Sequence, residues 1–557
     1  MRILPQANRM ICLVLAMLLA AGCLSACANG PSAGSPGLSA EEAQKTERFL
    51  TAVDQEPDTA DFQCTTIYYT VAQNVFDRLV ETAVGPDGET SIVPSLAESW
   101  VVSEDGLRYT FHLREGVRFH NGAVLTSDDV YYTFVRLLTH PYSCNRDIAR
   151  NILGADRLEK GETDVLEGFH VLNDRDFSIT LEQPFAAFLS CLSMPGASIL
   201  NKDSTIKAGV RFGNTAYHTV GTGPFIFHSW VPYQGIVLKA NPDCWSGPPE
   251  YDGVELRFIT DSVEDRLQYE NGSLDVLDLD DLGDAAEYYI HGDIYQDNLV
   301  SVRQVGISYI ALNESIRPLN NVKVRRALQL GLNRQMLLDA VYSGRGDLEN
   351  GIFPRGLKGW NPDLPEIPFD PDAARRLLKE AGFKDGFDLT FSVKSTSTPL
   401  EREMVRMVAS MWEKIGVHTE VEMLDENSFM EQRKSGRLAC YTATWQADFD
   451  DPDNFIYTFF GSAENTRCRS LCYPDETVMK RVRDARSILD EDARMQEYRE
   501  LEQTLIQDDA AWIPLFSRQH YYVVGDRVEE FRVSWYGGFK ACFRDMKLKQ
   551  TAGLAPF

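Results

Sequence analysis

Apolar and polar residues alternate most regularly within residues 96–138. Over residues 107–113 every second side chain is apolar, which is the period of a β-strand with one buried face. Asp105-Gly106 lies before this strand and further glycines follow it, so the segment predicts a small antiparallel meander. Beyond it the apolar residues recur at helical spacing, and Thr126 or Ser127 is suited to cap a helix whose first turn is acidic. We interpret this segment as scaffold.

A second pattern lies at the N-terminus, where an apolar stretch follows two basic residues. Arg2 and Arg9 precede Met10–Ala21, which is too short for a comfortable membrane span and has the layout of a secretory signal. Residues 28–39, ANGPSAGSPGLS, are small or turn-forming and have nothing to bury, so they predict a flexible tether. No later segment has the length and apolar content of a transmembrane helix.

The length and composition of the chain indicate a large folded protein. Of its 557 residues, 44% are hydrophobic and 11% aromatic, which is enough for two or more domains with large cores. The formal net charge is −27, and removal of a signal that holds two arginines would make it −29, which disfavours nucleic acid as a partner. The sequence has no Walker A loop and no metal-ligand motif, so we predict neither an enzyme nor a metal or cofactor site.

Several segments resemble one known family. Residues 96–138, LAESWVVSEDGLRYTFHLREGVRFHNGAVLTSDDVYYTFVRLL, are similar to the signature block of the family 5 extracellular solute-binding proteins, which deliver peptides and related solutes to ABC importers. Gly221–Phe225, GTGPF, resembles a turn of that family, and residues 322–342, VKVRRALQLGLNRQMLLDAVY, resemble the helix that opens its second domain. Residues 370–383, DPDAARRLLKEAGF, predict a further helix with proline in its first turn and glycine at its end.

The resemblance implies a two-lobed α/β architecture of the periplasmic-binding-protein type (type II, class C), with a hinge between the lobes. Two crossing strands would join the lobes, one within residues 300–313 and the other within 512–524, and both segments are rich in β-branched and aromatic residues. The expected parts are a signal peptide (1–26), a lipidated tether (27–45), lobe one (46–300 and 513–557, with an extra subdomain at about 86–210) and lobe two (301–512).

A lipid anchor is predicted where the signal ends. Leu24–Cys27, LSAC, resembles the lipobox of bacterial lipoproteins, in which small residues precede a cysteine whose thiol is lipidated. The alternative is Cys23, which fits less well because alanine takes the place of the branched residue usually found three positions before the cysteine. We expect Cys27 to be the first mature residue and to anchor the protein on the extracytoplasmic face of the cell membrane.

The segment best suited to ligand recognition is Trp445–Phe455, WQADFDDPDNF. In peptide-binding members of the family the matching W-x-x-D places an acid against the α-amino group of the peptide, which makes Asp448 the candidate here. A carboxylate in a closed, water-poor cleft forms a charge-assisted hydrogen bond with an ammonium group. Further ligand contacts, either through side chains or through backbone that pairs with an added peptide strand, are expected from Trp445, Gln446, Ala447, Tyr68 and Tyr69.

Two features depart from the dipeptide-binding relatives. Those proteins use an arginine just before a proline, and an aromatic residue just after it, to hold the ligand termini, whereas this chain has Thr398-Pro399-Leu400. A longer peptide whose carboxyl end is held elsewhere is therefore favoured, with Lys394 as a candidate substitute. Cys468 and Cys472 resemble a loop disulfide of these relatives at a shorter spacing, and the eight cysteines after Cys27 leave about 105 complete pairings open.

These observations predict a substrate-binding lipoprotein that captures peptides, expected to be oligopeptides, and passes them to the permease subunits of an ABC importer. We expect it to act as a monomer without a cofactor. Two alternatives stay open: the same fold with a non-peptide solute such as a nickel complex, oligosaccharide, haem or opine, and a receptor for peptide pheromones. The acid at Asp448 favours a ligand that carries an amine.

Overall fold

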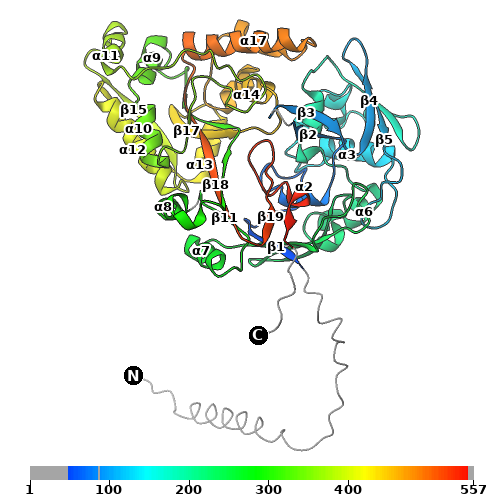
Figure 1. The fold of residues 1–557 in the computed structure, drawn as a ribbon. Helices are drawn as coiled ribbons and strands as arrows, with labels where there is room; N and C mark the ends of the chain where they lie inside the picture. Colours follow the sequence, from blue (N-terminus) through cyan, green and yellow to red (C-terminus); the bar gives the residue numbers. More distant parts are fainter. Residues whose placement is uncertain (1–47, 86–87, 281, 550–557) are drawn as a thin grey trace, which may run out of the picture. The chain divides into compact units, whose positions relative to one another are not determined.

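The computed structural model of the chain describes residues 48–85, 88–280 and 282–549 (Figure 1). The predicted signal and tether, with Cys27 and its alternative Cys23, lie outside the described residues. Within the described ranges, no helix is long and apolar enough to cross a membrane.

A four-stranded sheet holds the start of the described chain. Its order is β1-β10-β9-β8, with β1 parallel to β10 and the other pairs antiparallel. The strands are β1 Phe49–Val53, β8 Phe225–Val231, β9 Gly235–Ala240 and β10 Gly253–Arg257. Their buried side chains share one core with Tyr522, Val528 and Phe543. The end of the chain therefore returns to the sheet that contains its start, as the red and blue segments of Figure 1 show.

The alternating segment forms the meander that its pattern predicts. Its sheet has the antiparallel order β4-β5-β7-β6. The strands are β4 Ala97–Val102, β5 Arg108–Leu113, β6 Phe169–Val171 and β7 Asp176–Thr180, and a separate hairpin consists of β2 Val80–Val84 and β3 Thr90–Pro94. The alternate residues Tyr109, Phe111 and Leu113 are buried and share a core with α3 (Ser127–Thr139). Thr126 caps α3 in a capping box with Asp129.

The largest sheet links two cores of the described chain. Its order is β11-β18-β13-β17-β15-β16, and β12 and β14 also pair with β18. The strands are β11 Val276–Asp278, β12 Leu299–Arg303, β13 Gly306–Leu312, β14 Gly346–Leu348, β15 Phe387–Lys394, β16 Val417–Leu424, β17 Cys440–Gln446 and β18 Trp512–Val524. Trp512 at the start of β18 lies in the core beside β13 and β17, whereas Tyr522 near its end lies in the core of the β1 sheet. β18 thus crosses between two cores, and the other predicted crossing segment forms β12 and β13.

Helices pack against the large sheet and beyond it. They are α9 Val322–Leu330, α10 Arg334–Tyr342, α11 Pro371–Glu380, α12 Pro399–Glu413, α13 Glu426–Lys434, α14 Asp453–Phe460, α15 Ala463–Cys468, α16 Glu476–Ala485 and α17 Glu491–Gln503. The expectation of one helix over residues 322–342 is wrong, because the helix is interrupted between α9 and α10. Asn333 starts the second helix by accepting a hydrogen bond from the Met336 N–H (2.9 Å), and Gly331 fits where a β-carbon would clash with Ile415.

Candidate functional site

Strand β17 has one unpaired edge. It pairs with β13 over its whole length, whereas β15 pairs with it only at Cys440. The Ala447 N–H donates to the Val305 carbonyl (2.9 Å), and in an antiparallel pair every second residue faces the same neighbour. The backbone groups of Thr444 and Gln446 therefore face the other edge, where no strand of the described chain pairs with them. An extended ligand can add itself to such an edge.

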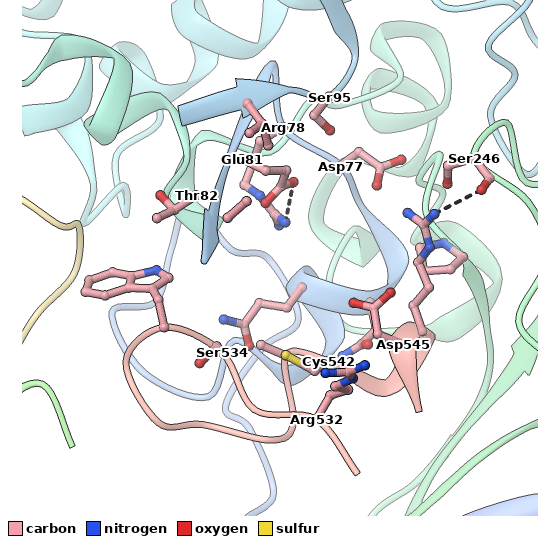
Figure 2. Close-up of a pocket in the computed structure, with 18 of the residues that line it drawn as sticks. Asp77, Arg78, Glu81, Thr82, Ser95, Ser246, Arg532, Ser534, Cys542 and Asp545 are labelled. Carbon is pink, nitrogen blue, oxygen red and sulfur yellow. Dashed lines mark hydrogen bonds and ion pairs between the residues drawn. The ribbon is translucent and has the colours of Figure 1, made fainter. Parts of the chain in front are cut away.

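Asp448, two residues beyond β17, lines a cavity of about 870 Å³. Most of the wall comes from three places, namely the segment that follows α2 (Thr70–Val75), the β2–β3 hairpin and residues 530–547. Figure 2 shows side chains of these segments facing one another across the cavity. The charged wall residues are Asp77, Glu81, Glu250, Asp448, Glu530, Asp545, Arg78, Arg532, Arg544 and Lys547. A wall with both signs of charge suits a polar, zwitterionic solute.

Two of the four acids that follow β17 have buried arginine partners. Asp451 accepts two hydrogen bonds from the Arg494 guanidinium, both 2.8 Å long, and this pair is buried. Asp453 pairs with Arg486 at 2.9 Å. Both arginines belong to the α16–α17 region, so these ion pairs attach the acidic turn to its own helices.

The same turn also touches the meander region. Phe449 is buried in the core of the meander. Asp450 accepts a hydrogen bond from the Lys358 N–H (2.8 Å) and another from the hydroxyl of Thr90, the first residue of β3. The turn that contains the predicted ligand acid is therefore held between two parts of the molecule.

Unlike Asp451 and Asp453, Asp448 has no ion pair with a cation of the described chain. Its N–H donates to Asn454 Oδ1 (2.9 Å), and its Oδ2 accepts from Asn454 Nδ2 (3.1 Å), which fixes the side chain. Burial raises the pKa of the Asp448 carboxyl, while the hydrogen bond from Asn454 and the more distant Arg469 charge lower it. The side chain is nevertheless exposed, and it lines the cavity. This carboxylate is held in place and has no cation of the described chain as its partner.

The other residues predicted in this segment lie differently. Trp445 packs edge-to-face on Phe459, with ring centroids 5.4 Å apart, and the Arg469 guanidinium lies over its ring at 5.1 Å. Its indole nitrogen is buried without a hydrogen-bond partner. Ala447 is buried and Gln446 is exposed. Of the predicted ligand residues in this segment, Asp448 is the one that lines the cavity.

The two tyrosines predicted to face the ligand immediately precede α2. The Tyr69 hydroxyl donates to the Thr65 carbonyl (2.8 Å) and contacts Asn145 Nδ2 (3.0 Å). Burial raises the pKa of Tyr69, the hydrogen bond with Asn145 lowers it, and the charge of Asp448 adds to the rise. Tyr68 is exposed and has φ of +61°, a conformation that residues with a side chain rarely adopt.

Sequence reasoning missed most of the cavity wall. Arg78 pairs with Glu81 at 2.5 Å, and Arg544 donates to the Ser246 carbonyl at 2.9 Å (Figure 2). These residues come from three distant stretches of the chain, and no motif links them. They meet because the end of the chain packs into the same core as β1 and β8–β10.

The region that departs from the dipeptide-binding relatives has local structural roles. The Thr398 hydroxyl caps α12 by accepting a hydrogen bond from the Glu401 N–H (3.1 Å). Lys394, the candidate substitute clamp, pairs with Glu426 at 3.1 Å and lies over the Phe429 ring at 5.7 Å. Both side chains already have partners within the protein.

One described group of side chains has ligand atoms close enough to hold a metal. These atoms, from Asp278, Asp280 and His520, lie within 4.8 Å of one another. Asp280 pairs with His520 and with Arg518, the latter at 3.0 Å. Because the Arg518 guanidinium already pairs with this carboxylate, we interpret the group as a polar network between β11 and β18.

The crossing strand between two cores, the polar cavity and the unpaired strand edge define a class of protein, the two-lobed solute-binding proteins of mixed α/β type. A solved structure agrees with this: the ABC transporter-associated periplasmic binding protein DppA from Helicobacter pylori in complex with peptide STSA. The similarity covers 90% of this chain and 98% of that chain, with a TM-score of 0.73 and 25% sequence identity. The predicted fold class is confirmed.

The family follows from the sequence. The family model described as bacterial extracellular solute-binding proteins, family 5 Middle, matches residues 91–467. The chain belongs to this family of solute-binding proteins, which are not enzymes. It is 29% identical to heme-binding protein A of Haemophilus influenzae over 85% of this chain and 87% of that protein. It is also 29% identical to the dipeptide-binding protein of Escherichia coli, over 81% of this chain and 84% of that protein.

Proposed function

We propose that this protein captures peptides with a free α-amino group and delivers them to the permease of an ABC importer. The observation that carries the proposal is Asp448, a fixed carboxylate on a cavity wall without a protein cation as its partner. A peptide ammonium would supply that cation and form a charge-assisted hydrogen bond. The unpaired edge of β17 supports the same ligand, because the backbone groups of Thr444 and Gln446 can pair with a peptide whatever its side chains are.

Oligopeptides are favoured over dipeptides. Lys394 is already paired with Glu426, and Thr398 caps a helix, so neither offers a clamp for a carboxylate close to the amine site. A cavity of about 870 Å³ has room for several residues. The carboxyl end of the peptide would then lie farther along the cavity.

Closure of two lobes around the ligand would couple capture to delivery. The proposed lobes are residues 46–300 with 513–557, and residues 301–512. Contacts between them support a closed form: the Ala186 N–H donates to the Arg486 carbonyl (3.0 Å), and the Ser487 hydroxyl donates to the Pro184 carbonyl (3.0 Å). A ligand drives closure only through its preference for the closed state. Anchoring through a lipid on Cys27 would keep the protein beside the importer.

The first test identifies the ligand itself. Native mass spectrometry of the purified full chain should detect co-purified peptides, and a peptide library should raise its melting temperature. Haem is the competing solute, because one relative is named for binding it. Haem bound with no peptide mass and no stabilisation by the library would contradict the proposal.

The second test concerns the amine site. Asp448→Asn should weaken a peptide with a free amino group about 100-fold and its N-acetylated form less than about threefold, because only the free amine is charged. Glu250→Gln is the matched control: this acid lines the same cavity but pairs with Lys547 at 3.7 Å. It should leave both affinities nearly unchanged. Equal losses for the two peptides in Asp448→Asn would remove Asp448 from the amine site.

A further inference from the structure

Two cysteines that are 80 positions apart in the sequence lie close together beside Asn145, which contacts the Tyr69 hydroxyl. The Cys144 N–H donates to the Gln63 carbonyl (2.8 Å), and Cys144 Sγ lies 3.6 Å from the carbonyl oxygen of Cys64. The Cα atoms of Cys64 and Cys144 are connected through this hydrogen bond, the N–Cα bond of Cys144 and the peptide unit between Gln63 and Cys64. Their separation is therefore at most about 7 Å. A disulfide spans Cα atoms about 4.4–6.8 Å apart. Both residues are free thiols in the structure.

We propose that Cys64 and Cys144 are a site of oxidative modification and form a disulfide outside the cytoplasm, where such bonds persist. The oxidant would be a thiol–disulfide oxidoreductase in its disulfide form. The other cysteine pair singled out by the sequence lacks this arrangement: Cys468 Sγ lies 3.4 Å from Glu464, whereas Cys472 Sγ lies 3.9 Å from the Gly436 carbonyl.

The difference in exposure between the two thiols indicates the order in which they react in the thiol–disulfide exchange. Cys144 is exposed and can reach a protein oxidant, whereas Cys64 is half-buried. The Cys144 thiolate would attack the disulfide of the oxidant, form a mixed disulfide and release one thiolate. Cys64 would then attack Cys144 Sγ and release the second thiolate. Two thiols of this protein are thereby oxidised to one disulfide, and one disulfide of the oxidant is reduced to two thiols.

A histidine is placed to assist the second step. Burial and the neighbouring carboxylate of Asp61 raise the pKa of Cys64 to about 12, so its thiol needs a base. His140 Nδ1 lies 3.3 Å from Cys64 Sγ. Burial, followed by the charge of Arg136, lowers the pKa of His140, which keeps the ring neutral and able to accept the proton.

The bond would fix a loop that borders the proposed ligand site. Asn145, next to Cys144, already donates to the carbonyls of Phe62 and Thr65, both at 2.8 Å, and contacts the Tyr69 hydroxyl. A covalent link would reinforce these contacts and hold the strained turn that leads into α2. This effect on ligand binding rests on the proposed function, whereas formation of the bond does not.

Disulfide mapping of the purified full chain tests the bond itself. After incubation with oxidised glutathione and alkylation by N-ethylmaleimide in denaturant, proteolysis should yield a linked peptide pair that contains Cys64 and Cys144. Cys144→Ser should release Cys64 as an alkylated thiol, and the control Cys468→Ser should leave the link intact. Alkylation of both residues in the wild type, or glutathione retained on Cys144 beside an alkylated Cys64, would overturn the proposal.

A melting experiment tests whether the disulfide stabilises the protein. Because the link closes a loop of about 80 residues in the unfolded chain, reduction should lower the melting temperature by about 5 °C. The Cys64→Ser/Cys144→Ser double variant should melt at the same temperature with and without reductant. An equal drop in the wild type and the double variant would show that the stabilising bond lies elsewhere. Neither experiment needs a ligand, so their outcome is independent of the peptide proposal.

Discussion

At the residue scale, the four aspartates of one turn differ in what surrounds them. Asp451 and Asp453 each face a buried arginine, and Asp450 accepts hydrogen bonds from Lys358 N–H and the Thr90 hydroxyl. Asp448 has an amide as its partner and no cation. Its side chain is exposed in the cavity, so its charge is open to a cation of the ligand. The same residue type therefore supports the fold at three positions and is available to ligand at one.

The raised pKa of Asp448 predicts that peptide affinity depends on pH. Only the ionised carboxylate attracts an ammonium, so affinity should be constant above the pKa of Asp448 in the free protein. It should fall as the pH decreases through that pKa, approaching about tenfold per pH unit. Calorimetric titration between about pH 4.5 and 7 with a peptide of uncharged side chains measures this profile, since the ligand amine stays charged throughout. Asp448→Asn should bind weakly with a flat profile, and a flat wild-type profile would contradict the assignment.

At the scale of elements, β17 combines two environments in one strand. One edge pairs with β13 from Cys440 to Gln446, and the other is free beyond Cys440. Exposed edges are usually blocked in soluble proteins, because they recruit other strands. Here the free edge ends at the acid proposed to hold the amine of the ligand. A peptide fixed at its amino end would be aligned for backbone pairing along β17.

Backbone pairing predicts a specific sensitivity to N-methylation of the ligand. In an added strand every second peptide N–H donates to the protein, so methylation at alternate positions should weaken binding about tenfold. The intervening positions should tolerate the methyl group with less than about a threefold loss. Affinities of a series of singly N-methylated peptides provide the measurement. A uniform loss at all positions would exclude pairing with the edge of β17.

At the scale of the whole described molecule, contacts between distant segments join the two proposed lobes. Phe449 is buried in the core of the meander, and the Arg486 guanidinium lies over the Phe185 ring at 4.2 Å. The hydroxyl of Thr90 donates a hydrogen bond to Asp450, two residues from Asp448. Each of these contacts exists only while the two regions are together, so each would favour the proposed closed form by its own free energy.

Thr90→Val should therefore weaken ligand binding without touching the ligand. The substitution keeps the shape of the side chain but removes the hydroxyl that donates to Asp450, at a cost of about 1 kcal/mol, or about fivefold in affinity. Most of the loss should appear as faster dissociation. Thr139→Val is the control, because its hydroxyl bonds only the Val135 carbonyl of its own helix (2.8 Å). If Thr90→Val has a normal melting curve and unchanged peptide affinity, the contact between Thr90 and Asp450 does not contribute to closure.

Local pattern predicted much of the fold correctly. β5 and α3 appear where alternation and capping indicated, and β18 has the predicted bounds Trp512–Val524. The break between α9 and α10 was missed, because both helices share one apolar period and only the cap at Asn333 separates them. For the ligand residues, the sequence named Asp448 through a resemblance and could not distinguish it from Asp450, Asp451 or Asp453 by composition.

By itself, the sequence determined the family, the secondary structure of its most regular segments and the acidic turn in which a ligand acid was to be sought. These depend on residues near one another in the chain, whose periods and caps act over one or two turns of backbone. Only the tertiary structure decided that Arg494 and Arg486 neutralise two of the acids, that Asp448 has no such partner, and that the end of the chain completes the cavity. The reason is physical: the charge and exposure of a side chain depend on neighbours that folding brings from tens to hundreds of residues away.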